Sequence, residues 1–177
     1  GSLLASKLLG YLMLNQGYDV KVSEVHGMSQ RGGSVVTYVR YGDHVYSPVI
    51  DRGEADAIVS FELLEAARWL PYLKESGKIV TNTGRIDPMP VITGAAQYPE
   101  QLAEKMTAAG AHVDALDCLS LAKEAGNLKS VNLVLLGRLS HYFDFPESAW
   151  QEAIEACVPE KFLDVNKKAF ELGKSAQ

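Results

Sequence analysis

The chain has 177 residues, of which 47% are hydrophobic and 22% are charged, with 17 Lys and Arg against 22 Asp and Glu. This length and composition fit one globular domain and exclude a disordered chain, a collagen and a coiled coil. The net charge of -5 and the absence of a basic run argue against nucleic acid or an anionic membrane surface as a partner. The apolar stretches are also far shorter than the ~20 residues of a membrane span.

The two cysteines, Cys118 and Cys157, lie far apart in the sequence. This usage fits reduced thiols in a cytoplasmic protein better than a disulfide scaffold. Two thiols are also too few for an iron–sulfur cluster, which normally takes four.

The first half of the chain predicts a helix, a strand and a hairpin. Leucines at helical spacing indicate a helix over residues 3–16, and alternating valines indicate a strand over residues 18–25. A second strand is expected over residues 34–41. The Gly42-Asp43 pair then predicts a turn, which would make an antiparallel hairpin of the Val36–Val45 region.

Strands and helices alternate through the middle of the chain. The sequence predicts strands over 57–61, 78–82 and 111–116, and helices over 62–70, 99–109 and 120–125. Residues 89–93, between prolines, are expected to form an edge or loop segment, and the last third is expected to be helical over 131–142, 147–156 and 161–172. The pattern predicts one α/β domain over residues 1–177, a three-layer, Rossmann-like fold with a mostly parallel sheet and one antiparallel hairpin.

One glycine-rich segment, His26 to Gly33 (HGMSQRGG), is unlike an ordinary loop. Its glycines permit close backbone approach, its amides could form an anion-binding nest, and Arg31 could bind a phosphate or carboxylate. The alternative is a tight connection between two strands with a solvated Arg31. The candidate residues for a ligand or partner loop are His26, Gly27, Gln30, Arg31, Gly32 and Gly33.

The sequence contains no other recognisable metal-binding or catalytic motif. The four histidines do not have metal-ligand spacing, no GxSxG nucleophile motif is present, and no residue can be assigned a catalytic role. Glu62 and Glu65 are interpreted as favourable charges at the start of a helix.

The segment SEVHGMSQRGGSVVTYVRYG resembles the signature of the gamma domain of 2-oxoacid:ferredoxin oxidoreductases, and within them the small subunit of the indolepyruvate enzymes. The resemblance continues through SPVIDRGEADAIVSFELLEAARWLPYL and SVNLVLLGRLSHYF to NKKAFELGK, in the same order and over nearly the whole chain.

Members of that family usually begin with a strand and a GxGGQG loop. Gly1 matches the last glycine of that loop, which implies that the first strand is missing from this sequence. Gly1 and Ser2 are then expected to start a helix whose backbone amides can bind an anion.

The resemblance implies a subunit that is inactive alone. In such enzymes a 2-oxoacid is decarboxylated on thiamine diphosphate, electrons leave through iron–sulfur clusters to ferredoxin, and coenzyme A accepts the acyl group. It implies that thiamine diphosphate and the clusters lie on a larger partner subunit, that this chain alone binds no cofactor, and that an aryl pyruvate such as indolepyruvate is the substrate. The alternatives are a free-standing α/β module that binds a nucleotide or an anion, and a purely structural assembly subunit.

Aromatic residues in the C-terminal third have two possible roles. They could supply an apolar contact patch for the partner, or they could belong to the core of this chain. The residues concerned are Tyr142, Phe143, Phe145 and Trp150.

Overall fold

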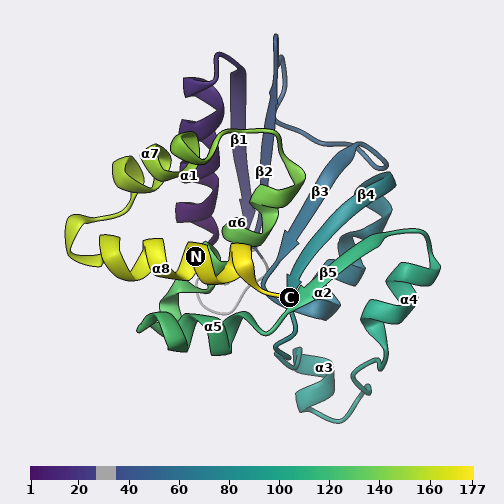
Figure 1. The fold of residues 1–177 in the computed structure, drawn as a ribbon. Helices are drawn as coiled ribbons and strands as arrows, with labels where there is room; N and C mark the ends of the chain where they lie inside the picture. Colours follow the sequence, from purple (N-terminus) through teal and green to yellow (C-terminus); the bar gives the residue numbers. More distant parts are fainter. Residues whose placement is uncertain (27–34) are drawn as a thin grey trace.

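A parallel three-stranded sheet forms the centre of the molecule. In a computed structural model that describes residues 1–26 and 35–177, strands β3 (Ala55–Ser60), β4 (Leu73–Asn82) and β5 (His112–Leu116) pair in the order β3-β4-β5 (Figure 1). Both pairs are parallel, with Ile58 opposite Ile79 and Val80 opposite Asp114. The predicted parallel sheet is therefore confirmed.

Helices cover both faces of this sheet because successive side chains on a strand point to opposite faces. Ile79 of β4 packs with Ala66 of α2 (Leu63–Trp69) and Met106 of α4 (Leu102–Ala108). The next residue, Val80, belongs to the larger core on the other face, which includes helix α6 (Val131–Leu139). This arrangement confirms the predicted three-layer α/β class.

The antiparallel hairpin lies elsewhere than predicted. Strands β1 (Asp19–His26) and β2 (Val35–Gly42) pair with each other from Asp19 opposite Gly42 to His26 opposite Val35, in a separate two-stranded sheet. Helix α1 (Ser2–Asn15) packs on this hairpin, with Gly10 facing Val22.

The predicted turn at Gly42-Asp43 does not lead into a third strand, so the hairpin prediction for Val36–Val45 is wrong. Residues 43–54 form no strand, and β2 pairs with β1, which precedes it in the chain. The backbone N–H of Val45 instead donates to Oδ2 of Asp19 at 2.8 Å. This hydrogen bond, and not pairing with a further strand, holds the residues that follow β2.

The last third of the chain is helical, as predicted. Besides α6 it contains α5 (Cys118–Ala125), α7 (Glu147–Cys157) and α8 (Leu163–Ser175). Short 3-10 turns complete the fold at Leu70–Tyr72, Leu128–Ser130, Ser140–Tyr142 and Glu160–Phe162. None of the helices in the described residues has the length and apolar character needed to cross a membrane.

Two segments differ locally from the prediction. Residues 89–93 were expected to be an edge or loop, but Met89–Ile92 form the short helix α3. Helix α4 begins at Leu102 rather than near Pro99, because Gln101 adopts a left-handed conformation with φ 56°.

The C-terminal aromatic residues belong to the core. Trp150 is 1% exposed and packs against Phe145 and Phe170, with ring centroids 6.4 and 5.7 Å away. Tyr142, Phe143 and Phe145 are partly buried against the same cluster. Core packing is therefore the role of Trp150, and the other three side chains pack on the core while staying partly exposed.

Candidate functional site

The carboxyl ends of the parallel strands meet at one edge of the sheet, where ligand sites of open α/β folds usually form. β3 leads there into Phe61 and Glu62, and β5 leads into Asp117 and Cys118. The start of α1 reaches the same edge, because a Cβ added at Gly1 would lie 3.2 Å from the Phe61 ring. We refer to this region as the carboxyl edge.

Asn82, the last residue of β4, holds this edge together. Its Oδ1 accepts a hydrogen bond from the Cys118 N–H at 3.0 Å, and its Nδ2 donates to the Phe61 carbonyl at 3.3 Å. The next amide, of Thr83, donates to the carbonyl of Leu116 at 2.8 Å. One buried amide side chain therefore connects the end of β4 to the residues that follow β3 and β5.

Glu62 is a buried carboxylate with two partners at the carboxyl edge. Its side chain is at the N-cap of α2, where Oε2 accepts from the Glu65 N–H at 2.9 Å, as the helix-start interpretation expected. Its Oε1 accepts a hydrogen bond from the hydroxyl of Tyr98. Burial, and secondly this hydrogen bond, raise the pKa of Tyr98 to about 12.

An exposed cation lies beside this pair. The Arg85 guanidinium lies 4.3 Å from the centre of the Tyr98 ring, and its Nε donates to Asp87 at 2.5 Å. The pKa of Arg85 is raised, first by the hydrogen bond to Asp87. Arg85 is thus a permanent cation that is paired with Asp87 and lies over the Tyr98 ring.

The predicted site residues are described only in part. Gly1 and Ser2 do start a helix, and the first turn of α1 carries no acidic side chain. His26 ends β1 opposite Val35, at the end of the hairpin that points the same way as the carboxyl ends of β3 and β4 (Figure 1). The remaining loop residues, Gly27, Gln30, Arg31, Gly32 and Gly33, lie outside the described residues.

The sequence did not single out Asn82, Arg85 or Tyr98. Tyr98 and Glu62 are 36 residues apart, and no periodicity relates them. The available signal was position alone, since Asn82 ends, and Arg85 follows, a predicted strand whose carboxyl end faces the site. Within residues 1–26 and 35–177 no group of three or more His, Cys, Asp or Glu side chains could hold a metal ion.

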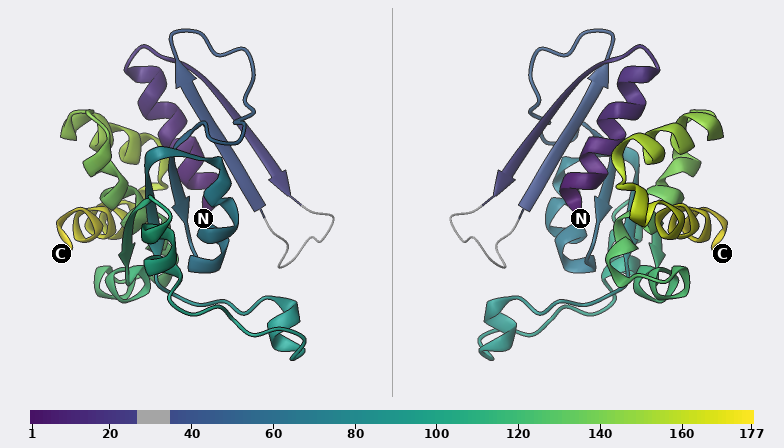
Figure 2. Two further views of the ribbon diagram at one scale, coloured as in Figure 1. Left: turned by 90° about the vertical axis from the view of Figure 1, so that its right-hand side faces the viewer. Right: turned by 90° about the vertical axis from the view of Figure 1, so that its left-hand side faces the viewer.

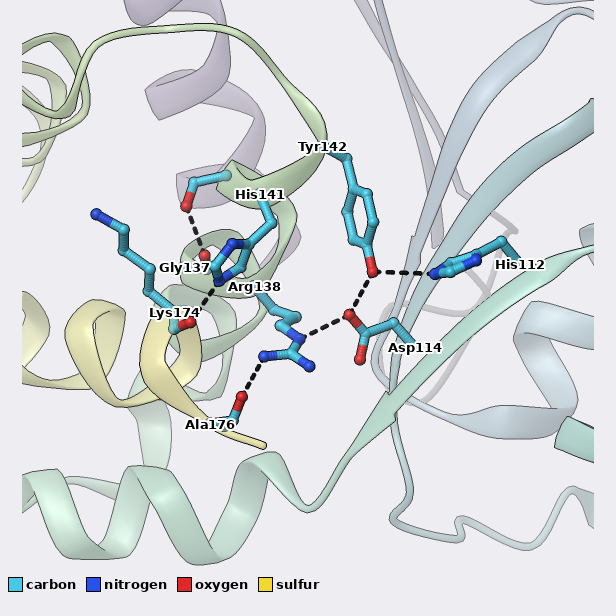
Figure 3. Close-up of polar contacts among 9 residues, drawn as sticks. His112, Asp114, Gly137, Arg138, His141, Tyr142, Lys174 and Ala176 are labelled. Carbon is cyan, nitrogen blue, oxygen red and sulfur yellow. Dashed lines mark hydrogen bonds and ion pairs between the residues drawn. The ribbon is translucent and has the colours of Figure 1, made fainter.

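A second polar cluster lies around the first residues of β5, away from the carboxyl edge (Figure 3). Nε of Arg138 and the hydroxyl of Tyr142 both donate to Oδ2 of Asp114, each at 2.6 Å. Arg138 also donates to the carbonyl of Ala176, and a ring nitrogen of His141 contacts the carbonyl of Lys174. This cluster fastens the C-terminal end of α8 to the sheet, so its role is structural.

Comparison with known proteins places the chain in a family. Residues 1–176 match the family model described as "Pyruvate ferredoxin/flavodoxin oxidoreductase". The indolepyruvate oxidoreductase subunit IorB of Thermococcus kodakarensis is 47% identical, over 99% of this chain and 90% of that protein.

Solved structures share the fold at low identity. The keto/oxoacid ferredoxin oxidoreductase gamma subunit from Geobacter sulfurreducens matches with a TM-score of 0.68 and 21% identity, over 97% of this chain and 88% of that one. The 2-oxoglutarate:ferredoxin oxidoreductase from Magnetococcus marinus, solved with 2-oxoglutarate, coenzyme A and succinyl-CoA bound, matches with a TM-score of 0.62 and 20% identity. That match covers 96% of this chain but 27% of the longer chain. The match of the family model over residues 1–176, with the relative that is 47% identical, shows that the chain belongs to the pyruvate ferredoxin/flavodoxin oxidoreductase family.

Proposed function

We propose that the chain is the small subunit of a 2-oxoacid:ferredoxin oxidoreductase whose substrate is an aryl pyruvate such as indolepyruvate. The observation that carries this proposal is the 47% identity, along almost the entire chain, to a protein named as an indolepyruvate oxidoreductase subunit. In the proposed reaction the 2-oxoacid loses carbon dioxide, coenzyme A takes the acyl group as a thioester, and two electrons pass to ferredoxin.

We further propose that a larger partner subunit carries the redox chemistry. Thiamine diphosphate and the iron–sulfur clusters would be bound there, since a cluster normally takes four thiolates and this sequence has two cysteines. Ferredoxin would then meet the partner and not this chain directly. That the fold of this chain spans 27% of a longer oxidoreductase chain is consistent with a subunit working beside larger parts.

The proposed task of this chain is to shape the entrance for coenzyme A or the 2-oxoacid at the carboxyl edge. Both molecules are anions. The first turn of α1, at Gly1 and Ser2, offers backbone amides, and Arg31 in the glycine-rich segment offers a bidentate cation. The roles of these residues and of His26 stay predictions.

Reconstitution tests the proposed function. The purified chain is assayed with indolepyruvate, coenzyme A and a viologen electron acceptor, with and without the larger subunit. We expect viologen reduction only when both are present. Viologen reduction by the isolated chain, or a folded chain that never joins a larger subunit, would refute the proposal. In the second case, binding of a nucleotide by the isolated chain would favour the free-standing module.

Substitution of Arg31 tests the entrance. Arg31→Ala should lower turnover of the assembled enzyme at limiting coenzyme A while leaving the stability of the chain nearly unchanged. The matched control is Arg52→Ala, which removes an exposed arginine near the amino end of β3 and should leave turnover intact. Equal turnover in both variants would exclude a role for Arg31.

A further inference from the structure

A long segment leaves the carboxyl edge and returns to it without entering the core. Residues 83–101 connect β4 to α4 and carry the short helix α3, and both views of Figure 2 show this segment projecting from the body. In residues 83–101, all of which the structure describes, no side chain is buried. We refer to residues 83–101 as the arm.

The base of the arm is nevertheless held firmly. Tyr98 is anchored through its hydroxyl on Glu62, which is 4% exposed, and Arg85, in the outgoing part of the arm, stacks on the Tyr98 ring. A buried carboxylate is costly unless it is hydrogen-bonded. The protein therefore uses a buried polar contact to fix the direction of a segment that adds nothing to its core.

The far part of the arm is apolar and orders itself. Its tip, residues 88–97, includes no charged side chain, and Met89 and Ile92 there are 68% and 66% exposed. The backbone amides of Val91, Ile92, Thr93 and Ala96 donate to carbonyls within the arm, and Pro88 and Pro90 restrict the chain further. In a chain with 22% charged residues, this uncharged tip is a surface suited to contact with protein.

The size and shape of the tip indicate which protein it contacts. Complete burial of two such side chains removes roughly a few hundred Å² from water, whereas a stable interface needs about 800 Å² from each partner. Two tips packed together could not sustain a dimer of this chain. A tip of this size can anchor a complex only where the same partner also covers the surface from which the arm projects. That surface is the carboxyl edge.

We propose that the arm is a docking anchor for the larger, thiamine diphosphate-bearing subunit, with Met89 and Ile92 inserted into an apolar groove of that subunit. This inference rests on the proposed function, because that function supplies the partner. Rigid attachment at Glu62 and Tyr98 reduces the ordering that binding would otherwise require. It also places the carboxyl edge against the partner in one fixed orientation.

The experiment measures assembly and not activity. The wild-type chain and the double variant Met89→Asp/Ile92→Asp are titrated into the larger subunit, and the Kd of each complex is determined. We expect the double variant to raise the Kd about tenfold or more, as loss of an interface anchor does. The control is Val49→Asp, because Val49 is 50% exposed but lies in the segment that leads into the amino end of β3.

Hydrogen exchange gives a second measurement that needs no variant. Amides of residues 84–97 should become protected when the wild-type chain joins the larger subunit. Wild-type binding with an unchanged Kd for the double variant, or with no added protection of these amides, would overturn the anchor and leave the proposed function standing. Absence of wild-type binding would overturn the function itself. A self-association of the isolated chain that the double variant abolishes would overturn the anchor in favour of a second copy.

Discussion

Gly137 of α6 and Gly173 of α8 allow these two helices to cross with their backbones in contact. A Cβ atom added at Gly137 would overlap the carbonyl of Phe170, and one added at Gly173 would overlap the carbonyl of Val134. Both obstacles are backbone atoms of the opposite helix, which no side-chain rotation can move. The two glycines thus set the spacing at the centre of the helical third.

Gly137→Ala should therefore destabilise the chain strongly. Overpacking of a close-packed core costs about 1–3 kcal/mol. Because the obstacle at this crossing is rigid backbone, we expect the loss in free energy of unfolding to lie at the upper end of that range or above it. Denaturant unfolding followed by circular dichroism measures the loss. Gly10→Ala is the matched control, because its Cβ would meet only Val22 Cγ2 at 3.8 Å. Alanine is preferred over glycine in helices by about 1 kcal/mol, so equal losses in the two variants would contradict the explanation.

Asn82→Ala should loosen the carboxyl edge. The substitution leaves the Cys118 N–H and the Phe61 carbonyl without the partner that each has in the wild type. Each unsatisfied buried group costs about 1–3 kcal/mol, so the free energy of unfolding should fall by several kcal/mol at most. The neighbouring control is Thr83→Ala, since Thr83 is exposed and bonds Leu116 through its backbone. If the two variants unfold at the same denaturant concentration, Asn82 does not brace the edge.

Tyr142→Phe should change how stability depends on alkaline pH. Burial, and secondly the hydrogen bond to Asp114, raise the pKa of Tyr142 to about 12, against an ordinary value of 10.0. The folded chain holds this proton more tightly than the unfolded chain, so the contribution is complete below pH 10 and is lost as the pH rises towards 12.

The variant lacks that contribution at every pH. It should be about 1–3 kcal/mol less stable than the wild type near neutral pH, and the gap should narrow in strong alkali. Urea unfolding at about pH 8 and about pH 11 measures both differences. A constant gap at the two values would show that the Tyr142 proton is not what stabilises the cluster.

Both cysteines should be unreactive in the folded chain. Burial, and secondly the nearby Asp117 carboxylate, raise the pKa of the Cys118 thiol to about 12. Burial also raises the pKa of Cys157. Because the thiolate is the reactive form, iodoacetamide should modify neither residue near neutral pH and both after unfolding in urea, as mass spectrometry can record. Rapid labelling of the native chain would mean that α5 or α7 opens readily.

Local sequence patterns predicted the elements but not how they meet. Leucine spacing predicted a helix over residues 3–16, and the observed α1 is Ser2–Asn15. Helix α5 begins two residues before the predicted start because Asp117 accepts a hydrogen bond from the Ser120 N–H at 3.1 Å. The Gly42-Asp43 prediction failed because the residues beyond it form no strand, and the Val45 N–H bonds the Asp19 side chain and not the β2 backbone.

The candidate site depended on contacts that have no local signature. The pairing of Glu62 with Tyr98 and the bridging by Asn82 join residues brought together only by the order of the strands. The resemblance of the sequence to a known family predicted the helix start at Gly1 and Ser2. The same resemblance predicted the family to which the chain belongs. The sequence did not predict the projecting arm. The proline-rich residues 88–93 predict a loop equally well whether that loop packs on the body of the protein or projects from it.

The burial of both natural thiols makes the chain a ready background for site-directed spectroscopy. Ala95 is exposed on the arm, and a cysteine placed there would be the one thiol open to a fluorophore or a nitroxide in the folded chain. A single reporter at the tip of the arm could then register the arrival of another macromolecule through quenching or slowed tumbling, in real time and without turnover. No existing cysteine would have to be removed first, so the tagged chain would keep its native interior.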